Sequence, residues 1–206
     1  PGIAPAELDH TEGCFRDEIG LPADAKVFGF IGQLGRGKGV FQLVQAFGLI
    51  GESLPDWHLV MAGANTNDVP LLEQEISLLP EPIQRRVHIV RGFPLGRKGD
   101  LFRALDVFVT PSMNESFGIT TVEAWHCGVP VISTRLAAVQ SFVVHGEDAI
   151  LVERGARHEL AGAMVELAVD EGYRDGLRTN GLARARSLTW ADTASAVDEF
   201  YRDLLG

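Results

Sequence analysis

Short apolar runs alternate with helical patterns along most of the chain. Six runs are rich in β-branched and aromatic residues, as buried strands usually are: 26–32, 57–63, 87–92, 106–111, 129–134 and 149–152. Between them lie segments with apolar residues at helical spacing, such as VFQLVQAFGLI and LLEQEISLL. Because strand and helix alternate, the pattern predicts a doubly wound α/β fold, with a parallel sheet of about six strands and helices on both faces.

The two ends of the chain carry different patterns. Residues 1–25 are rich in Pro and charged residues, which predicts a linker with one short helix. Residues 157–206 show helical patterns only, and we expect this C-terminal tail to pack on the sheet. Thr189 and Asp192 have the spacing of a capping box, so they predict the start of the last helix.

Composition and charge limit the classes of function. The 206 residues, 46% of them hydrophobic, can form one domain with a sizeable core. A formal net charge of -10 without a basic cluster argues against a nucleic-acid partner. No apolar run approaches the roughly 20 residues of a transmembrane segment. We therefore expect a cytoplasmic protein, with peripheral attachment of the full-length protein to a membrane as the alternative.

Two further features of the composition concern metals and chain length. Cys14 and Cys127 lie far apart, and the histidines are scattered, so no metal-ligand spacing is present and no metal is expected. The chain begins at Pro1 rather than at methionine, which indicates a fragment or a processed product.

The first candidate for binding chemistry is GQLGRGKG, residues 32–39, between the first strand and the first long helix. Gly32, Gly37 and Lys38 match part of a P-loop, but Gly39 stands where Mg²⁺ binding needs a Ser or Thr hydroxyl, which disfavours an ATPase. A GxGxxG dinucleotide motif cannot be aligned here. Glycines that admit close backbone approach, a lysine and a following helix still favour phosphate binding. The alternative is a flexible turn with a solvated lysine.

The second candidate is NESFGITTVEAWHCGVPV, residues 114–131, which follows the fourth strand. Glu115 lies in the loop, Glu123 lies inside a helix expected to start near Thr120, and the N–H groups of residues 117–119 come between them. A helix start binds anions, and carboxylates beside it are suited to accept hydrogen bonds from ribose or hexose hydroxyls. The structural alternative for Glu123 is a helix cap formed with Thr120.

Together these motifs resemble the donor-binding half of the retaining, GT-B-fold glycosyltransferases of group 1 (family 4). The resembling segments are FIGQLGRGKGVFQLVQAF, LVMAG, DVFVTPSMNESFGITTVEAWHCGVPVIST and HGEDAILV. The most specific part is Glu115 and Glu123, separated by seven residues and followed by Ala, Cys-Gly and Pro-Val. The opening PGIAPAEL resembles the segment that joins the family's two Rossmann-like domains. The resemblance implies that residues 26–206 form a Rossmann-like nucleotide-sugar donor domain and that an N-terminal acceptor domain is missing.

The resemblance also implies a role for each candidate residue. Lys38 would contact the diphosphate of the donor, and the N–H groups of residues 117–119 would cradle it. Glu123 would hold the ribose, Glu115 would contact the transferred hexose, and Arg91 would line the base pocket unless it is a solvated arginine at a strand end. Catalysis in the family is retaining and requires neither a metal nor a cofactor. The candidate catalytic residues are Glu115 and Lys38, and the donor-binding candidates are Gly32, Gln33, Lys38, Arg91, Glu115, Ser116, Phe117, Gly118, Ile119 and Glu123.

Two departures from the family pattern leave the activity open. The family's arginine after the first loop glycine is Gln33 here, and Arg36 is the candidate replacement. The loop after the fifth strand, usually Gly-Gly followed by Glu, reads Ala137, Ala138 and Ser141. Two hypotheses therefore stand. The chain is the donor domain of a hexosyl-transferring enzyme, or it is a nucleotide-sugar-binding module without transfer.

Overall fold

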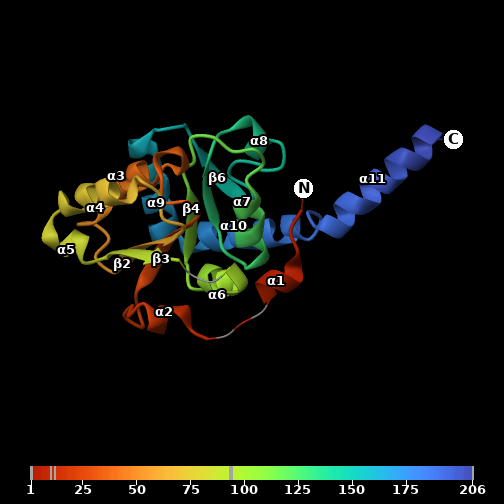
Figure 1. Cartoon of the computed structure of the whole chain (residues 1–206). Helices are drawn as coiled ribbons and strands as arrows, with labels where there is room; N and C mark the ends of the chain where they lie inside the picture. Colours follow the sequence, from red (N-terminus) through yellow and green to blue (C-terminus); the bar gives the residue numbers. More distant parts are fainter. Residues whose placement is uncertain (1, 10, 12, 93–94, 206) are drawn as a thin grey trace.

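One sheet of six parallel strands forms the centre of the computed structural model, which describes residues 2–9, 11, 13–92 and 95–205 (Figure 1). The strands are β1 (Lys26–Ile31), β2 (Trp57–Gly63), β3 (Val87–Arg91), β4 (Val107–Thr110), β5 (Val131–Thr134) and β6 (Ala149–Val152). Their order across the sheet is β3-β2-β1-β4-β5-β6, and every pairing is parallel. The predicted doubly wound α/β fold is confirmed, and each strand lies within one of the predicted runs.

Alternate residues of each strand enter two separate cores. On β1, Phe28 and Phe30 lie in one core, whereas Val27 and Ile31 lie in the other. Both faces of the sheet are buried, which explains why the strands read as continuous apolar runs rather than as alternating ones.

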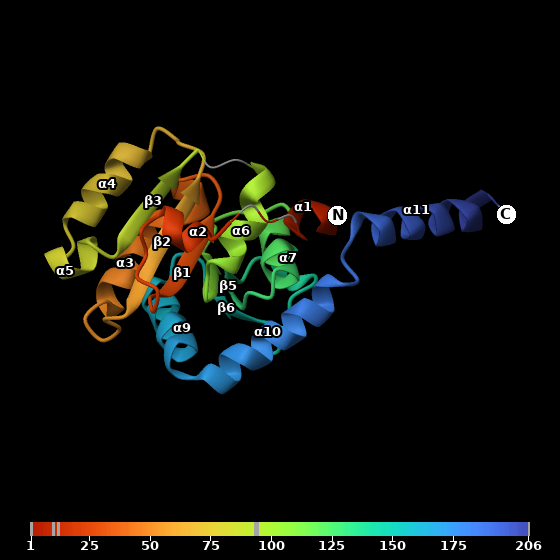
Figure 2. The ribbon, with the colours of Figure 1, turned by 90° about the horizontal axis from the view of Figure 1, so that it is seen from below.

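Helices cover both faces of the sheet, as Figures 1 and 2 show. The first core is closed by α3 (Val40–Ile50), α4 (Val69–Ser77), α5 (Glu81–Gln84) and α9 (Arg157–Val169). The second core is closed by α1 (Pro5–Asp9), α2 (Phe15–Glu18), α6 (Lys98–Arg103), α7 (Ile119–His126) and α8 (Ala137–Gln140). One long helix, α10 (Glu171–Ala185), contributes Leu177 to the first core and Ala185 to the second. Two short 3-10 helices, η1 (Arg36–Lys38) and η2 (Leu95–Arg97), precede α3 and α6.

The N-terminal segment packs on the body of the domain. Leu8 of α1 and Phe15 of α2 are buried in the second core. Ile3 donates its N–H to the Leu188 carbonyl at 3.0 Å and accepts from the Trp190 N–H at 3.1 Å. The start of the chain is thus fastened to the segment that leads into the last helix. The division into a linker, 1–25, and a domain, 26–206, remains a prediction, and both ranges include residues outside the described part of the chain.

The last helix corrects the expectation that the whole C-terminal tail packs on the sheet. α9 does pack on β5 and β6, and α10 packs on α7. By contrast, α11 (Trp190–Leu205) extends away from the body of the domain (Figures 1 and 2). The expectation was wrong for α11 because its apolar residues find no core to enter, although Thr189 and Asp192 form the predicted capping box. Five large apolar side chains expose between 48% and 67% of their surface: Trp190, Val197, Phe200, Tyr201 and Leu204.

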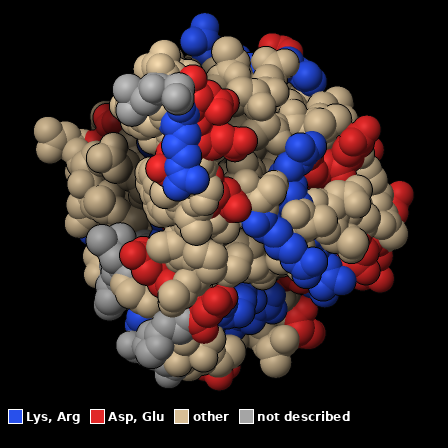
Figure 3. All heavy atoms as spheres, turned by 90° about the vertical axis from the view of Figure 1, so that its right-hand side faces the viewer, with Lys and Arg blue, Asp and Glu red and all other residues tan. Residues whose placement is uncertain are grey.

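Charged side chains of opposite sign lie next to one another on the face drawn in Figure 3. Ion pairs along the C-terminal helices have the same mixed character, since Arg178 lies 3.2 Å from Asp175 and Arg202 lies 2.6 Å from Asp198. The arginines at these two positions therefore belong to a solvated, charge-balanced surface. Within the described ranges, no helix combines the length and apolar character that a membrane crossing requires.

Candidate functional site

The loops that follow β1 and β4 meet at the carboxyl edge of the sheet. The strand order reverses between these two strands, and doubly wound sheets bind ligands at such a point. The Met113 N–H donates to the Gly37 carbonyl at 3.0 Å and joins the two loops. Gly39 has a φ of +72°, and a Cβ at this position would lie 1.9 Å from the Pro111 carbonyl oxygen. Only glycine fits this contact, so the loops can approach closely because residue 39 has no side chain.

A lysine and a glutamate from these two loops form a close pair. Lys38 Nζ lies 2.6 Å from Glu115 Oε1. The buried hydroxyl of Ser112 donates to the same oxygen at 2.7 Å, and the Thr110 hydroxyl lies 3.5 Å from that of Ser112. The carboxylate is thus held from two sides, while part of the Lys38 side chain stays accessible. An anion that enters the site would meet a cation that is already positioned.

The helix α7 begins beside this pair and adds a second source of positive potential. Gly118 is its N-cap residue, with a φ of +92°, and the first hydrogen bond of the turn runs from the Thr121 N–H to the Gly118 carbonyl at 3.0 Å. The preceding N–H groups belong to the part of a helix that has no intrahelical acceptor, so they are suited to bind an anion.

The cap predicted for Thr120 and Glu123 is wrong. The helix starts one residue earlier, at Ile119, and its N-cap glycine has no side chain that could accept a hydrogen bond. In a capping box the carboxylate belongs to the third helical residue, which is Thr121 here. Glu123 lies two residues further along the helix, so it cannot form that cap.

The carboxylate of Glu123 instead meets Lys98, a residue that the sequence reasoning did not consider. Lys98 Nζ lies 2.5 Å from Glu123 Oε2. Burial raises the pKa of Glu123, and Glu7 adds to this shift, whereas Lys98 opposes it. The two atoms are close enough for an ion pair, but their angles do not meet those of a hydrogen bond. The attraction between Lys98 and Glu123 is therefore mainly electrostatic.

Two adjoining cavities lie along this edge of the sheet. The smaller, about 100 Å³, lies beside the Lys38–Glu115 pair. Its lining residues are Phe30, Ile31, Gly32, Lys38, Thr110, Ser112, Glu115, Ile119 and Thr120. The larger, about 390 Å³, extends past the ends of β2 and β3. Its lining residues are Ile31, Gly32, Gln33, Gly63, Ala64, Gly92, Lys98 and Thr120. Because Ile31, Gly32 and Thr120 line both, the two cavities form one elongated cleft.

Comparison with known proteins gives this cleft a family context. The sequence model described as "Glycosyl transferases group 1" matches residues 14–184, which is most of the chain. The chain belongs to the group 1 glycosyltransferases. The resemblance stated from the two glutamates and the glycine-rich loop is thereby confirmed.

Curated relatives in this family include a D-inositol 3-phosphate glycosyltransferase from Corynebacterium urealyticum. The two sequences are 32% identical over 195 residues, which are 92% of this chain and 46% of the relative. A second relative of the same name, from Corynebacterium glutamicum strain R, is 29% identical over 193 residues. The chain thus spans about half the length of the curated relatives that it matches.

Several solved structures share the fold. A sucrose-phosphate synthase from Thermosynechococcus elongatus is 27% identical with a TM-score of 0.83, and the match covers 100% of this chain and 52% of that one. Anabaena Alr3699/HepE, solved with UDP and glucose, is 22% identical with a TM-score of 0.83, covering 98% and 53%. The C-terminal domain of a group 1 glycosyltransferase from Francisella tularensis, LpcC, is 24% identical with a TM-score of 0.78. That match covers 90% of this chain and 97% of the solved domain, so the fold corresponds to one domain of a GT-B protein.

The structure places five of the ten predicted site residues of this glycosyltransferase domain on the walls of the cleft, and Glu123 lines the adjacent small cavity instead. Gly32, Gln33, Lys38, Glu115 and Ile119 line it directly. The N-cap glycine of α7 lies at its edge, between the two glutamate positions.

Other predicted residues lie around the cleft rather than on its walls. The Arg91 guanidinium pairs with Glu73 of α4, although its neighbour Gly92 does line the cavity. Phe117 stacks on Phe142 with ring centroids 4.6 Å apart, so its side chain supports the loop. Ser116 is exposed and does not line either cavity.

The candidate replacement for the missing family arginine also points elsewhere. Arg36 lies over the ring of Phe41, 4.4 Å from its centroid, and its Nε lies 3.7 Å from Asp68 Oδ1. The second departure from the family pattern is the segment after β5. Ala137 and Ala138 are the first residues of the short helix α8 there, so this segment does not form an open glycine loop.

Four lining residues with polar or charged side chains were not among the predicted site residues, namely Lys98, Thr110, Ser112 and Thr120. Ser112 and Thr120 had a usable signal, since both lie within the loop and helix start that carry the two glutamates. Lys98 had none, because its contact with Glu123 joins residues that are far apart in the sequence.

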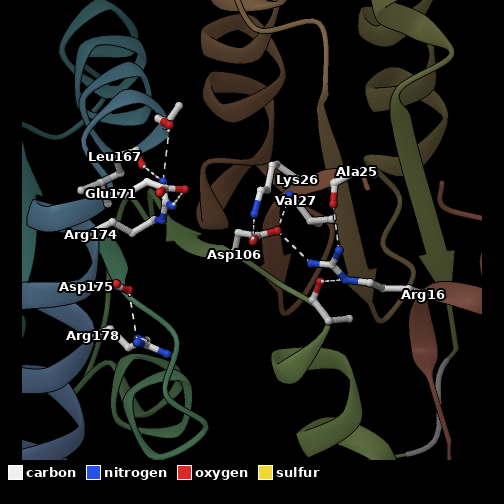
Figure 4. Close-up of polar contacts among 12 residues, drawn as sticks. Arg16, Ala25, Lys26, Val27, Asp106, Leu167, Glu171, Arg174, Asp175 and Arg178 are labelled. Atoms are coloured by element: carbon white, nitrogen blue, oxygen red, sulfur yellow. Dashed lines mark hydrogen bonds and ion pairs between the residues drawn. The ribbon is translucent and has the colours of Figure 1, made fainter. Parts of the chain in front are cut away.

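Another cavity, of about 410 Å³, lies at the opposite edge of the sheet, near the amino ends of β1, β4 and β5. Ion pairs line its walls, namely Lys26 with Asp106, Arg174 with Glu171 and Arg178 with Asp175 (Figure 4). Its size is similar to that of the larger cavity of the cleft, but it lacks the α7 N-terminus and the two loops of the carboxyl edge, and it borders the start of α10 instead. We therefore assign the functional site to the cleft.

Proposed function

We propose that this chain is the donor domain of a retaining glycosyltransferase and binds a nucleoside-diphosphate sugar in the cleft. The observation that carries the proposal is the Lys38–Glu115 pair, 2.6 Å apart, beside the N-terminus of α7. A cation and a helix N-terminus are suited to a diphosphate, and an adjacent carboxylate is suited to sugar hydroxyls. The solved Anabaena protein with UDP and glucose supports this ligand class by analogy.

Each part of the donor has a matching region of the cleft. The base and ribose would occupy the larger cavity, at the ends of β1, β2 and β3. The diphosphate would lie between Lys38 and the first N–H groups of α7, and the hexose would extend toward Glu115. Glu123, one turn into the helix, would accept hydrogen bonds from the ribose hydroxyls.

The chemistry follows from where charge develops. When the bond between the sugar and the diphosphate breaks, negative charge grows on the departing diphosphate. Lys38 and the α7 N-terminus would stabilise that charge, so the reaction would not need a metal. Among the described residues, no cluster of three or more His, Cys, Asp or Glu side chains could hold a metal ion.

The acceptor would be bound by a second domain. The curated relatives are about twice as long as this chain, which accounts for 46% of the first of them. The start of the chain and the start of α11 lie together through the Ile3–Leu188 and Ile3–Trp190 hydrogen bonds. A preceding domain would therefore attach beside the exposed apolar side chains of α11, which it could cover.

A binding module without transfer is the second candidate function. It is favoured by Gln33, which stands where the family has an arginine, and by Arg36, which is held by Asp68 and Phe41 rather than lining the cleft. If the site lacks this cation, the diphosphate can still bind to Lys38, but its departure would be less well stabilised.

Two measurements test the proposed function. Thermal unfolding of the chain with a panel of UDP, GDP and ADP sugars should show stabilisation by at least one donor, because a ligand that binds only the folded state raises its stability. Hexosyl transfer should be absent from the 206-residue chain and present when the same chain is joined to the preceding half. Stabilisation without transfer by the longer protein would favour the binding module, and no stabilisation by any donor would contradict both functions.

A further inference from the structure

Lysines are rare in this chain, and most of them lie at the cleft. The sequence contains only three lysines, Lys26, Lys38 and Lys98, among its 18 basic residues. Two of the three line the cleft, and each of these two pairs with one of the two glutamates of the family motif. The third, Lys26, lies at the opposite edge of the sheet, 3.5 Å from Asp106 (Figure 4).

The position of Lys98 links the cleft to Glu123. Lys98 is the first residue of α6, and it lines both the large cavity and a smaller one of about 150 Å³ beneath α1. Glu123 lines only the smaller of these two cavities. The Lys98 and Glu123 side chains expose only 20% and 14% of their surface. The Lys98 side chain therefore borders both the ligand space and the small cavity that holds the Glu123 carboxylate.

The surroundings of Glu123 make a compensating cation necessary. Glu7 of α1 lines the same small cavity and disfavours a second negative charge there. The Cys127 thiol, one turn further along, supplies no charge, because burial raises its pKa to about 12. Lys98 is the group that lowers the pKa of Glu123 against its burial. A protonated carboxyl loses acceptor capacity, so it could not serve two adjacent hydroxyls equally well.

We propose that Lys98 is a positioning residue that holds the Glu123 carboxylate, in its charged form, within reach of the ribose hydroxyls of the donor. This inference rests on the proposed function, since it assumes that a nucleoside diphosphate occupies the cleft. Through Lys98, the helix α6 would contribute to nucleotide affinity together with α7, which carries Glu123.

The experiment compares UDP with 2′,3′-dideoxy-UDP by calorimetry at pH 7.5. The variants are Lys98→Met, which keeps the length of the side chain, Lys98→Arg, which keeps its charge, and Glu123→Gln. Lys98→Met should weaken UDP about 5- to 30-fold and leave dideoxy-UDP within about 2-fold of the unsubstituted chain. Lys98→Arg should restore most of the loss. Lys26→Met is the matched control and should leave both affinities unchanged.

Two further readouts separate positioning from a structural role. Adding Lys98→Met to Glu123→Gln should weaken UDP by less than about 2-fold, because a residue that acts through Glu123 has nothing left to act on. Removing Lys98 should also raise the pKa of Glu123, so the loss of affinity on acidification should begin at a higher pH in Lys98→Met than in the unsubstituted chain. Unfolding temperatures of all variants identify any that fail to fold, and Lys98→Gln replaces Lys98→Met in that case.

Three results would overturn the inference. An equal loss for UDP and dideoxy-UDP would mean that Lys98 acts on another part of the nucleotide. Unchanged UDP affinity in Lys98→Met would mean that it has no role in binding. Absence of UDP binding to the unsubstituted chain would contradict the assumption of a UDP donor as well, whereas the first two results leave the proposed function intact.

Discussion

Glu115 and Glu123 belong to one sequence motif, but the structure gives them different surroundings. Glu115 lies in the loop, bonded to Ser112 and paired with Lys38, the residue expected to bind the diphosphate. Glu123 lies inside α7 and lines the small cavity beneath α1, where it pairs with Lys98, a residue that also lines the larger cavity. In the unliganded protein, Glu115 therefore holds the Lys38 ammonium, and an incoming diphosphate has to compete with Glu115 for it. Glu123 does not pair with Lys38 and does not compete in this way.

This difference predicts opposite effects on binding of the bare diphosphate. Glu123→Gln should weaken UDP and the cognate UDP sugar alike, by about 1 to 3 kcal/mol, because the ribose is common to both. Glu115→Gln should leave UDP affinity unchanged or raise it up to about 10-fold, because Lys38 no longer has to leave a carboxylate, and it should weaken only the sugar nucleotide. Calorimetric titration of each of the two variants with UDP and with the cognate UDP sugar measures these effects. Equal weakening of UDP by both variants would contradict this division of roles.

At the scale of the element, the site depends on how closely the β1 and β4 loops approach. Gly39 touches the Pro111 carbonyl in a left-handed conformation, whereas a Cβ on Gly37, two residues earlier, would meet nothing within 4 Å. The two glycines lie in the same segment, so they form a matched pair for mutation.

Gly39→Ala should lower the free energy of unfolding by about 1 to 3 kcal/mol or more, because it adds both backbone strain and a steric clash. Gly37→Ala should change it by less than about 0.5 kcal/mol, as expected for an unhindered surface position. Urea denaturation measures both. If Gly39→Ala were as well tolerated as Gly37→Ala, the close contact between the two loops would not exist in the folded protein.

The sequence predicted elements better than it predicted their ends and their tertiary contacts. All six strands and the helix 40–50 were visible because strand residues buried on both faces form continuous apolar runs. The start of α7 near Thr120 was predicted, but its N-cap residue was not, because the N-cap is a glycine and leaves no side-chain capping signal. The cleft was anticipated from its two loops, but Lys98 was not, because only the folded chain brings α6 against α7.

At the scale of the whole molecule, α11 stands apart from the rest. Its apolar residues have helical spacing, which is why the sequence predicted that it would be packed on the sheet. In the structure, Leu204 exposes 67% of its surface, whereas Leu160 of α9 exposes 2%. Amphipathic spacing indicates that a helix has an apolar face, but not which surface covers that face.

Leu204→Ala should therefore change the free energy of unfolding by less than about 0.5 kcal/mol, whereas Leu160→Ala should lower it by about 2 to 5 kcal/mol. Chemical denaturation of the 206-residue chain compares the two directly. A loss of 2 kcal/mol or more in Leu204→Ala, on the scale of core truncations, would mean that α11 folds back onto the domain in solution.

Binding of a nucleoside diphosphate in the cleft, through Lys38 and without a metal, is tested most directly by calorimetry with UDP. UDP should bind equally well with and without EDTA. Lys38→Ala should weaken it by about 1 to 3 kcal/mol, the scale of a charge-assisted contact, and Lys26→Ala should have no effect. Binding that EDTA abolishes, or that Lys38→Ala leaves unchanged, would contradict the account.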